Sequence, residues 1–264
     1  MSAPIALTSP HNELVRLWRS LGRDRAARLE NGAFMAEGEH MAQEALRTGY
    51  ARALIVAEGK LERYDGLISD AAGQGLPVYL ISPRALDAIA DTRTPQGVFC
   101  QCAAPRSDRP VEAPLCAVLQ DVQDPGNVGT VLRTLDAIGN GCCVLTRGCA
   151  DPLSPKALRA TMGAVFRVPF YLTDDLPSAL ADLRARGCRL MAGALDGTPF
   201  YDRPEDPDRV CLLIGNEGRG LSGDVRAMAD ISVRLPMQGG AESLNAAVAF
   251  AVMAYDVLRR RQSK

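Results

Sequence analysis

Two glycine-bearing stretches near the end of the chain decide its fold: residues 212–222 read LLIGNEGRGLS, and residues 235–245 read LPMQGGAESLN. Each begins as an apolar, strand-like segment and then runs into glycines and small polar residues. Such turns expose backbone N–H and C=O groups at the end of a sheet, where a small ligand can bind. A third stretch with the same pattern, DPGNVGTVLRT, occupies residues 124–134. Three such strand ends in one domain indicate a binding site rather than packing alone.

The overall composition is that of an ordinary globular protein. Of the 264 residues 47% are hydrophobic and 23% are charged, and the formal net charge is -1. The chain is therefore no polycation, which argues against tight non-specific binding of nucleic acid and leaves room for a local basic patch. Its longest apolar run, residues 246–255, is shorter than the about 20 residues that a membrane span needs. With no signal-peptide pattern in residues 1–12, we expect a cytoplasmic protein without a membrane partner.

The cysteine and histidine residues restrict the possible chemistry. None of the eight cysteines forms a C-x-x-C pair or lies near a histidine, so we expect free thiols in a reducing compartment and no metal. His11 and His40 are the only histidines, and both lie near the N-terminus. No Ser-His-Asp or Cys-His arrangement can therefore form within the glycine-rich half.

Apolar periodicity in the first half predicts alternating helices and strands, and hence a smaller α/β domain at residues 1–104. The expected helices are residues 12–30, 39–48, 65–72 and 83–90, and the expected strands are residues 32–36, 53–56, 77–81 and 97–102. Residues 105–114 are proline-rich and aperiodic, which is typical of a linker.

The alternation restarts after this linker and predicts a second domain at residues 115–264. We expect strands at residues 115–119, 142–145, 166–171, 189–192, 210–214 and 231–235. The expected helices are residues 128–138, 155–161, 177–186, 223–229 and 243–261. This order predicts a mostly parallel sheet with helices on both faces.

Each glycine-rich motif has an alternative interpretation. Residues 218–223 spell G-x-G-x-x-G, which would suggest a dinucleotide-dependent oxidoreductase, but the helix that follows is too short for the usual unit. Asn127 and Ser243 could simply cap helices. Arg16, Arg19 and Arg23 share one face of the first helix, and they could form either a solvated face or an RNA-binding patch.

Taken together, the three motifs resemble the SpoU-type (TrmH-like) ribose 2′-O-methyltransferases of RNA, members of the SPOUT superfamily. Their order and spacing agree across residues 115–261. The N-terminal half resembles the family's accessory RNA-binding domain, which is related to a kink-turn-binding ribosomal protein, through FMAEGEH at residues 34–40 and EAL at residues 44–46.

The resemblance implies a fold and a cofactor. The fold is a parallel sheet whose C-terminal segment forms a deep trefoil knot, a rare exception among folds. The cofactor is S-adenosylmethionine, held largely by backbone groups, and the family is homodimeric with a site built from both subunits. Carried over, the cofactor contacts are Ala192, Gly193, Gly215, Leu235, Met237 and Leu244.

The resemblance also implies methyl transfer to a ribose 2′-hydroxyl, with Arg133 as the activating group. A guanidinium stays protonated in proteins, so we expect Arg133 to clamp a phosphate and stabilise alkoxide charge. The remaining catalytic residues, which would orient the ribose, the phosphate and the motif loops, are Asn127, Glu217, Ser243 and Asn245. We expect ribosomal RNA as the substrate. The alternatives are a transfer RNA methyltransferase and a non-catalytic RNA-binding or ribosome-assembly protein of the same fold.

Overall fold

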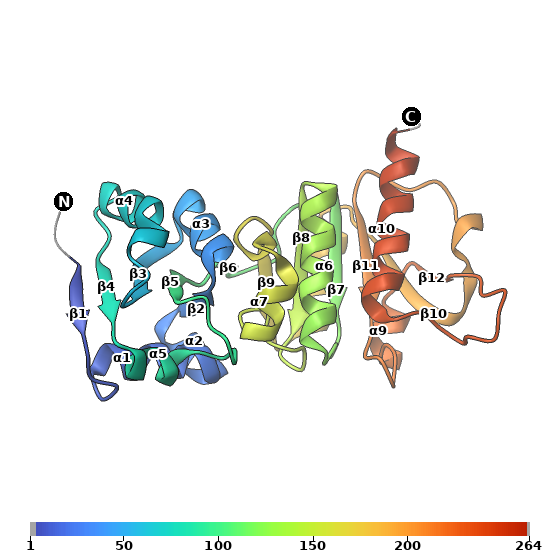
Figure 1. Cartoon of the computed structure of the whole chain (residues 1–264). Coiled ribbons are helices and arrows are strands. Elements are labelled where there is room, and N and C mark those ends of the chain that lie inside the picture. The colour runs from blue at the N-terminus through green and yellow to red at the C-terminus, as the bar shows by residue number, and fades with distance from the viewer. Residues whose placement is uncertain (1–3, 263–264) are drawn as a thin grey trace. The chain divides into compact units, whose positions relative to one another are not determined.

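The computed structural model describes residues 4–262 and divides the chain into two compact units (Figure 1). Unit 1 comprises the described part of Met1–Pro105 together with Leu153–Phe166. Unit 2 comprises Arg106–Pro152 and the described part of Arg167–Lys264. The segment Leu153–Phe166 follows the proposed linker in sequence, yet its contacts group it with unit 1.

Unit 1 is built on a mixed five-stranded sheet in the order β1-β4-β3-β5-β2. The strands are β1 (Ile5–Leu7), β2 (Ala33–Glu37), β3 (Ala51–Ala57), β4 (Val78–Ile81) and β5 (Val98–Ala103). Its helical elements are α1 (Glu13–Arg23), α2 (Arg25–Asn31), α3 (Glu39–Thr48), η1 (Glu62–Tyr64), α4 (Asp65–Gly73), α5 (Pro83–Ile89), α7 (Pro155–Thr161) and η2 (Ala164–Phe166).

Helices cover both faces of this sheet. On one face α1 and α5 bury Val15, Trp18 and Ile89 against strand residues such as Ile55 and Phe99. On the other face α3 and α4 pack against the central strands, as Figure 1 shows. The segment Leu153–Phe166 packs against the edge strand β2 and α3, where it completes the apolar core.

The single helix predicted over residues 12–30 is in fact two helices that meet at Asp24. The Asp24 side chain accepts a hydrogen bond from the backbone N–H of Ala26 at 2.8 Å and so caps α2. Aspartate is a favoured N-cap because its oxygen satisfies an otherwise unpaired helical N–H. The apolar period continues across the break, and this explains why periodicity alone joined the two helices.

Unit 2 contains a seven-stranded sheet in the order β12-β10-β11-β7-β8-β9-β6, and every neighbouring pair is parallel. The strands are β6 (Arg106–Ser107), β7 (Leu115–Leu119), β8 (Gly141–Thr146), β9 (Phe170–Thr173), β10 (Arg189–Pro199), β11 (Val210–Ile214) and β12 (Ile231–Arg234). The other elements are α6 (Pro125–Ile138), α8 (Leu176–Ala185), η3 (Phe200–Asp202), α9 (Gly223–Ala227) and α10 (Ala246–Gln262).

The central strands β7 and β11 are buried along their whole length. Strands covered on both faces read as continuous apolar runs, and therefore the sequence located these two strands to the residue. Helices α6 and α10 pack together on one face, in front of β7 and β11 in Figure 1. Helices α8 and α9 bury Leu180, Leu183 and Val225 on the other. The prediction of a parallel sheet with helices on both faces is confirmed.

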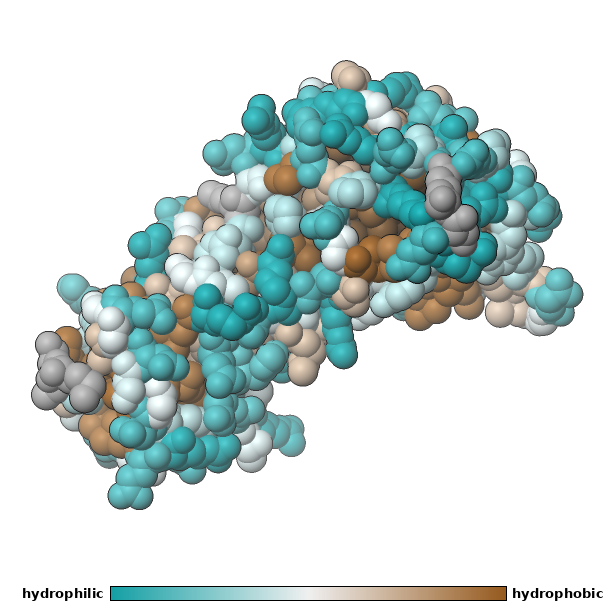
Figure 2. Space-filling model, turned by 90° about the horizontal axis from the view of Figure 1, so that it is seen from above, coloured by the Kyte–Doolittle hydropathy of each residue, from teal (hydrophilic) through white to brown (hydrophobic). Residues whose placement is uncertain are grey.

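All eight cysteines are buried as free thiols. Burial raises the pKa of the Cys102 and Cys143 thiols well above the ordinary value, so these groups stay protonated. Most charged side chains lie at the surface, and the exceptions are Arg28, Arg203 and Asp206, which are buried. Seen from above, hydrophilic residues gather around the C-terminal end of α10 (Figure 2), whose last turn carries Arg259, Arg260 and Arg261.

Candidate functional site

The three glycine-bearing motifs lie at the carboxyl ends of neighbouring strands of unit 2. Residues 120–124 follow β7, residues 215–222 follow β11, and residues 235–245 follow β12. Strands β8 and β9 lie on one side of β7, and the later strands β10, β11 and β12 lie on its other side. In open parallel sheets, ligands bind beyond the carboxyl ends at such a change of direction.

A cleft of about 770 Å³ lies at this edge. Small-molecule sites generally measure about 300–1,000 Å³, so the cleft has room for a cofactor and part of a second reactant. Its walls come from the end of β10, the 215–221 loop, residues 233–246 and two positions of α10. Apolar side chains line much of it, among them Ile214, Leu235, Met237, Leu244 and Met253.

Hydrogen bonds tie the three motifs together beside the cleft. The Asn127 side-chain amide donates to Glu217 Oε1 at 2.9 Å, and the Asn245 amide donates to Asn127 Oδ1 at 2.9 Å. Backbone N–H groups of Gln123 and Asp124 also donate to the Glu217 carboxylate, at 3.2 and 3.4 Å. One carboxylate thus joins the loops after β7 and β11, and Asn127 carries the connection on to α10.

This arrangement keeps Glu217 ionised. Partial burial by itself would raise the pKa of its carboxyl, but the hydrogen bonds from Asn127 and from backbone N–H groups outweigh burial and lower the pKa below the ordinary value. A carboxylate stabilised in this way is a weaker base. Glu217 is therefore suited to holding the loops and unsuited to removing a proton from a hydroxyl.

Asn245, rather than Ser243, caps the final helix. Its Oδ1 accepts from the backbone N–H groups of Ala247 and Val248 at 3.0 and 3.2 Å, while its amide binds Asn127. Ser243 lines the cleft and forms no hydrogen bond with another described residue. The helix-cap interpretation therefore applies to Asn245, which also joins the start of α10 to Asn127, and the Ser243 hydroxyl is left without a bond among the described residues.

Five of the six expected cofactor contacts line the cleft: Gly193, Gly215, Leu235, Met237 and Leu244. Ala192 is fully buried in β10 and does not line it. A Cβ atom at Gly215 would overlap the backbone of Gly220 and Leu221. Only glycine therefore permits the 215–221 loop to fold back on β11 and form this wall.

Arg133 lies outside the cleft of its own chain. It is exposed on α6, two turns beyond Asn127, and forms no ion pair with another described residue. Beside α6, the adjoining helix α10 exposes Val248, Val252 and Tyr255, with 37–50% of each residue accessible. Helix α6 thus carries an exposed guanidinium, and the helix packed against it carries an exposed apolar stripe.

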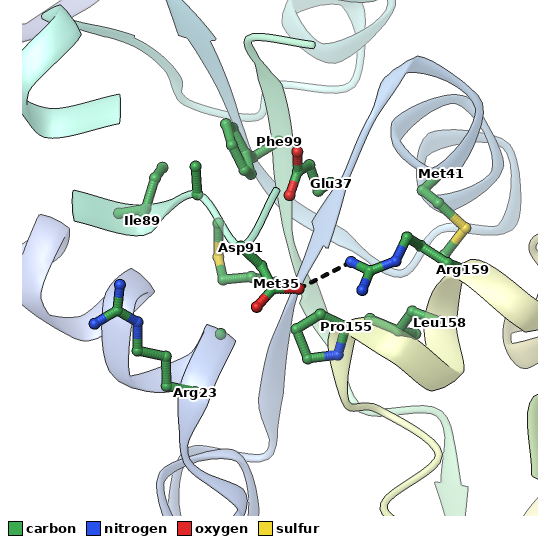
Figure 3. A pocket seen from close by; sticks show the side chains of 12 residues that line it. Arg23, Met35, Glu37, Met41, Ile89, Asp91, Phe99, Pro155, Leu158 and Arg159 are labelled. Atoms are coloured by element: carbon green, nitrogen blue, oxygen red, sulfur yellow. Dashed lines mark hydrogen bonds and ion pairs between the residues drawn. The ribbon is translucent and has the colours of Figure 1, made fainter. Parts of the chain in front are cut away.

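Unit 1 offers a much smaller pocket, about 30 Å³, which has room for about two water molecules. Met35, Met41 and Phe99 form apolar walls, and an ion pair between Arg159 and Asp91 at 2.9 Å lies on one side (Figure 3). It is too small for a nucleotide. Of the predicted RNA-binding residues Arg23 lines this pocket, and all three (Arg16, Arg19, Arg23) are exposed.

Across residues 4–262, no three His, Cys, Asp or Glu side chains form a group able to hold a metal ion. Among the helices of that range, none is long and apolar enough to cross a membrane.

Comparisons with known proteins agree with this geometry. The SpoU rRNA Methylase family model matches residues 114–255, and a model of the MRM3-like substrate binding domain matches residues 12–100. The 23S rRNA (guanosine(2553)-2′-O)-methyltransferase RlmP of Bacillus subtilis is 33% identical over 251 residues, which cover 94% of this chain and 97% of the relative.

Solved structures give the same result. A crystal structure of an rRNA methyltransferase from Sinorhizobium meliloti with AdoMet bound superimposes with a TM-score of 0.83 at 30% identity, covering 96% of this chain and 97% of the other. The SpoU methyltransferase AviRb from Streptomyces viridochromogenes, in complex with AdoMet, also has a TM-score of 0.83, at 26% identity and with 96% and 99% covered.

Proposed function

The chain belongs to the SpoU rRNA methylase family, and from this premise we propose that it transfers a methyl group from S-adenosylmethionine to a ribose 2′-hydroxyl in RNA. The observation that carries the proposal is the hydrogen-bonded junction of Asn127, Glu217 and Asn245 at the edge of a cofactor-sized cleft. Three motifs from distant parts of the sequence meet there and serve one site.

The residues that line the cleft fit S-adenosylmethionine. Glycines at 193 and 215 leave backbone groups uncovered, and the apolar side chains of Leu235, Met237 and Leu244 suit an adenosine. When bound, the cofactor supplies a methyl group activated by its sulfonium charge. Five residues of the cleft would hold it: Gly193, Gly215, Leu235, Met237 and Leu244. The preceding residue Ala192 is buried and would act indirectly, by positioning the backbone of Gly193.

Arg133 would act on the RNA rather than on the cofactor. A guanidinium can clamp a phosphate with two parallel hydrogen bonds and stabilise negative charge as it develops on the 2′-oxygen. Because Arg133 lies outside the cleft of its own chain, it would serve the cleft of a second copy. The exposed residues Val248, Val252 and Tyr255 on the adjoining helix α10 support a homodimer through this surface.

The other polar residues would position reactants and loops. Glu217 and Asn127 hold two motif loops at a fixed separation, and Asn245 anchors the start of α10 to them. The free hydroxyl of Ser243 is available to a ribose or phosphate oxygen. Positioning of two reactants alone can contribute about 7–11 kcal/mol to a barrier reduction.

We propose that the substrate is ribosomal RNA and that the protein acts in the cytoplasm. A separate unit resembling a substrate-binding domain precedes the catalytic unit, and the ribosomal activity of the curated relative favours the same class. Arg16, Arg19 and Arg23 would contribute phosphate contacts from α1. We also propose that unit 1 is related to kink-turn-binding ribosomal proteins, and that residues 1–104, 105–114 and 115–264 act as binding domain, linker and catalytic domain.

The trefoil knot is part of the same proposal. After β12 the chain passes along the cleft through residues 235–245 and returns as α10 to pack against β11 and α6, the course that a threaded C-terminal segment would take. Mechanical unfolding from both ends tests it. A knotted chain should stop short of the full contour length of 264 residues, whereas an unknotted chain should reach it.

The decisive experiment for the function replaces Arg133 by alanine. The variant should bind S-adenosylmethionine as wild type does, yet methylate ribosomal RNA about 100- to 1,000-fold more slowly, the usual cost of losing one charge-stabilising donor. Arg109→Ala removes another exposed arginine of unit 2 and serves as the control. Binding is measured by calorimetry and products by mapping 2′-O-methyl groups. Unchanged methylation by Arg133→Ala would refute the assigned role.

A further inference from the structure

The 215–222 loop forms one wall of the cleft, and hydrogen bonds within the loop define its conformation. Asn216 and Gly220 close it by exchanging two backbone hydrogen bonds, of 3.1 and 2.8 Å. Gly220 adopts a left-handed conformation with φ of 67°, which glycine reaches without steric cost. The Asn216 side chain then accepts from the backbone N–H groups of Gly218 and Arg219 at 3.0 and 3.1 Å. The loop is thus internally bonded, but these bonds do not fix its place on the sheet.

Both ends of this loop are attached to a dipeptide at the end of β7, Gln120–Asp121. At one end, the Asn216 amide donates to the backbone C=O of Asp121 at 2.8 Å. At the other end, the Gln120 amide donates to Ser222 Oγ at 2.9 Å and its carbonyl accepts from the Ser222 backbone N–H at 2.9 Å. The two attachments flank the turn that carries Glu217.

Asp121 is itself held in an unusual conformation. Its φ is 54°, in the left-handed region that residues other than glycine seldom adopt, although aspartate tolerates it better than most. Its backbone N–H donates to Thr146 Oγ1 at 2.9 Å, and the Thr146 hydroxyl donates back to Asp121 Oδ1 at 2.7 Å. These bonds from the end of β8 keep the Asp121 carbonyl aimed at Asn216.

We propose that Gln120 and Asp121 are positioning residues which hold the 215–222 wall in the shape that binds the methyl donor. Neither residue lines the cleft, so both act through Asn216 and Ser222. The inference rests on the proposed function, because it assigns this wall to S-adenosylmethionine. It adds a second attachment of the loop to the β7 end, separate from the Glu217–Asn127 bond.

Hydrogen exchange of the protein without cofactor tests the attachment directly. The backbone N–H groups of Gly218, Arg219 and Ser222 are donors in this network, and their exchange reports its opening. In Gln120→Ala these amides should exchange at least about 5-fold faster, the effect of losing a bond of ordinary strength. In Gln120→Glu the carboxylate can accept from both the N–H and the hydroxyl of Ser222, so protection should return toward wild type.

Cofactor binding gives the second readout, by calorimetry with S-adenosylmethionine at a temperature where every variant is folded. The dissociation constant should rise about 10-fold in Gln120→Ala and less than about 2-fold in Gln120→Glu. At the neighbouring position, Asp121→Asn keeps an acceptor for Thr146 and tolerates the left-handed backbone. Asp121→Gly removes the acceptor and also frees the backbone, so S-adenosylmethionine should bind more weakly to Asp121→Gly than to Asp121→Asn.

The outcomes separate this inference from the function on which it rests. Faster exchange at Ser222 in Gln120→Ala, weaker cofactor binding and recovery in Gln120→Glu together support the positioning role. Wild-type exchange and wild-type affinity in Gln120→Ala overturn it. If wild type itself does not bind S-adenosylmethionine, the proposed function fails, and the positioning role assigned for that ligand fails with it, whereas the exchange data still report the attachment.

Discussion

Both units consist of a sheet covered by helices, but their strand directions differ, and the candidate site lies in unit 2. In unit 2 all seven strands are parallel, so the loops after β7, β11 and β12 emerge at the same edge. In unit 1, β5 runs antiparallel to both of its neighbours, so the chain leaves β5 at the edge opposite to the one at which it leaves the other four strands. Unit 2 has a cleft of about 770 Å³ and unit 1 a pocket of about 30 Å³.

The units also differ in the interactions that stabilise the segments outside their sheets. The loops of unit 2 are attached by side-chain hydrogen bonds and ion pairs. The added segment of unit 1, Leu153–Phe166, is instead buried as apolar surface, with Leu158, Val165 and Phe166 each at most 4% exposed. We therefore expect polar substitutions to weaken unit 2 and apolar truncations to weaken unit 1.

The largest effect should follow from Arg203→Met in unit 2. Arg203 is 4% exposed, stacks over the Phe200 ring at 3.7 Å and forms ion pairs with Asp206 at 2.6 Å and Asp256 at 2.7 Å. Methionine keeps the apolar stem but removes the guanidinium that pairs with buried Asp206, and breaking a buried ion pair costs about 3–5 kcal/mol of unfolding free energy. Asp256 is partly exposed and keeps its ion pairs with Arg259 and Arg260. Denaturant unfolding measures the loss.

The control for this prediction is Arg226→Ala. Its ion pair with Asp196 is of similar length, 2.7 Å, but the two side chains are 37% and 69% accessible to solvent. Exposed pairs contribute about 0–1 kcal/mol, so this variant should unfold almost as wild type does. Equal losses of unfolding free energy in the two variants would mean that burial does not increase the contribution of the Arg203 ion pairs to stability.

The sequence predicted the regular parts of both units well, since local patterns determine them. The bounds of β7, β11, α3 and α7 agree with the structure because each is a continuous apolar run or an amphipathic period with clear ends. The strand predicted at residues 166–171 begins only at Phe170, since Phe166 ends a buried 3₁₀ turn. The short strand β1 was not predicted; it forms by pairing with β4, a contact far away in sequence.

The sequence predicted that the three motifs belong to one site, and the catalytic and cofactor-binding roles of their residues stay predictions; the hydrogen bonds that join the motifs were not predicted. The motifs located Asn127, Glu217 and Asn245 because glycines and polar residues follow apolar strands. Nothing in a single sequence indicates that Asn245 binds Asn127, or that Gln120 binds Ser222, since these bonds depend on strand order. The grouping of Leu153–Phe166 with unit 1 is likewise a tertiary property without a local signal.

The next prediction concerns the added segment of unit 1. Phe166 is 4% exposed, and its ring centroid lies 5.8 Å from that of Phe34 and 5.9 Å from that of Tyr50. Phe166→Ala should cost about 3–5 kcal/mol, the usual range for a buried phenylalanine. Hydrogen exchange should show reduced protection in β2 and β5 of unit 1, with β7 and β11 of unit 2 unchanged.

Arg159→Ala serves as the comparison in the same segment. Its ion pair with Asp91 is about half exposed on both sides, so removing it should cost at most about 1 kcal/mol. If Phe166→Ala instead weakens β7 and β11, the segment stabilises unit 2, and the contrast between the units is wrong.

A smaller effect is expected from the exposed arginines of α1. Arg16→Gln, Arg19→Gln and Arg23→Gln should weaken RNA binding without altering cofactor affinity, because they lie in the unit that lacks the cleft. The slope of log affinity against log salt should shrink by about 0.7 for each phosphate of a single strand that the protein no longer neutralises, and so by about two for the triple variant. Arg52→Gln, exposed on β3, should leave affinity and slope unchanged; a triple variant with the wild-type slope would assign these arginines to a solvated face.

The smallest effect is the pH dependence that Glu217 confers on unit 2. Its folded-state pKa is lowered because hydrogen bonds from Asn127 and backbone N–H groups outweigh partial burial. The unfolded state therefore binds a proton more readily, and the stabilisation is fully present above the unfolded pKa and is lost as pH falls through the folded value. Wild type should exceed Glu217→Gln in unfolding free energy at pH 7, and this advantage should decline below about pH 4.5, the ordinary value for a glutamate. Urea unfolding at pH 7 and pH 4 measures it. A difference that stays constant between these pH values would mean that the Glu217 carboxyl group joins the loops without any preference for its charged form.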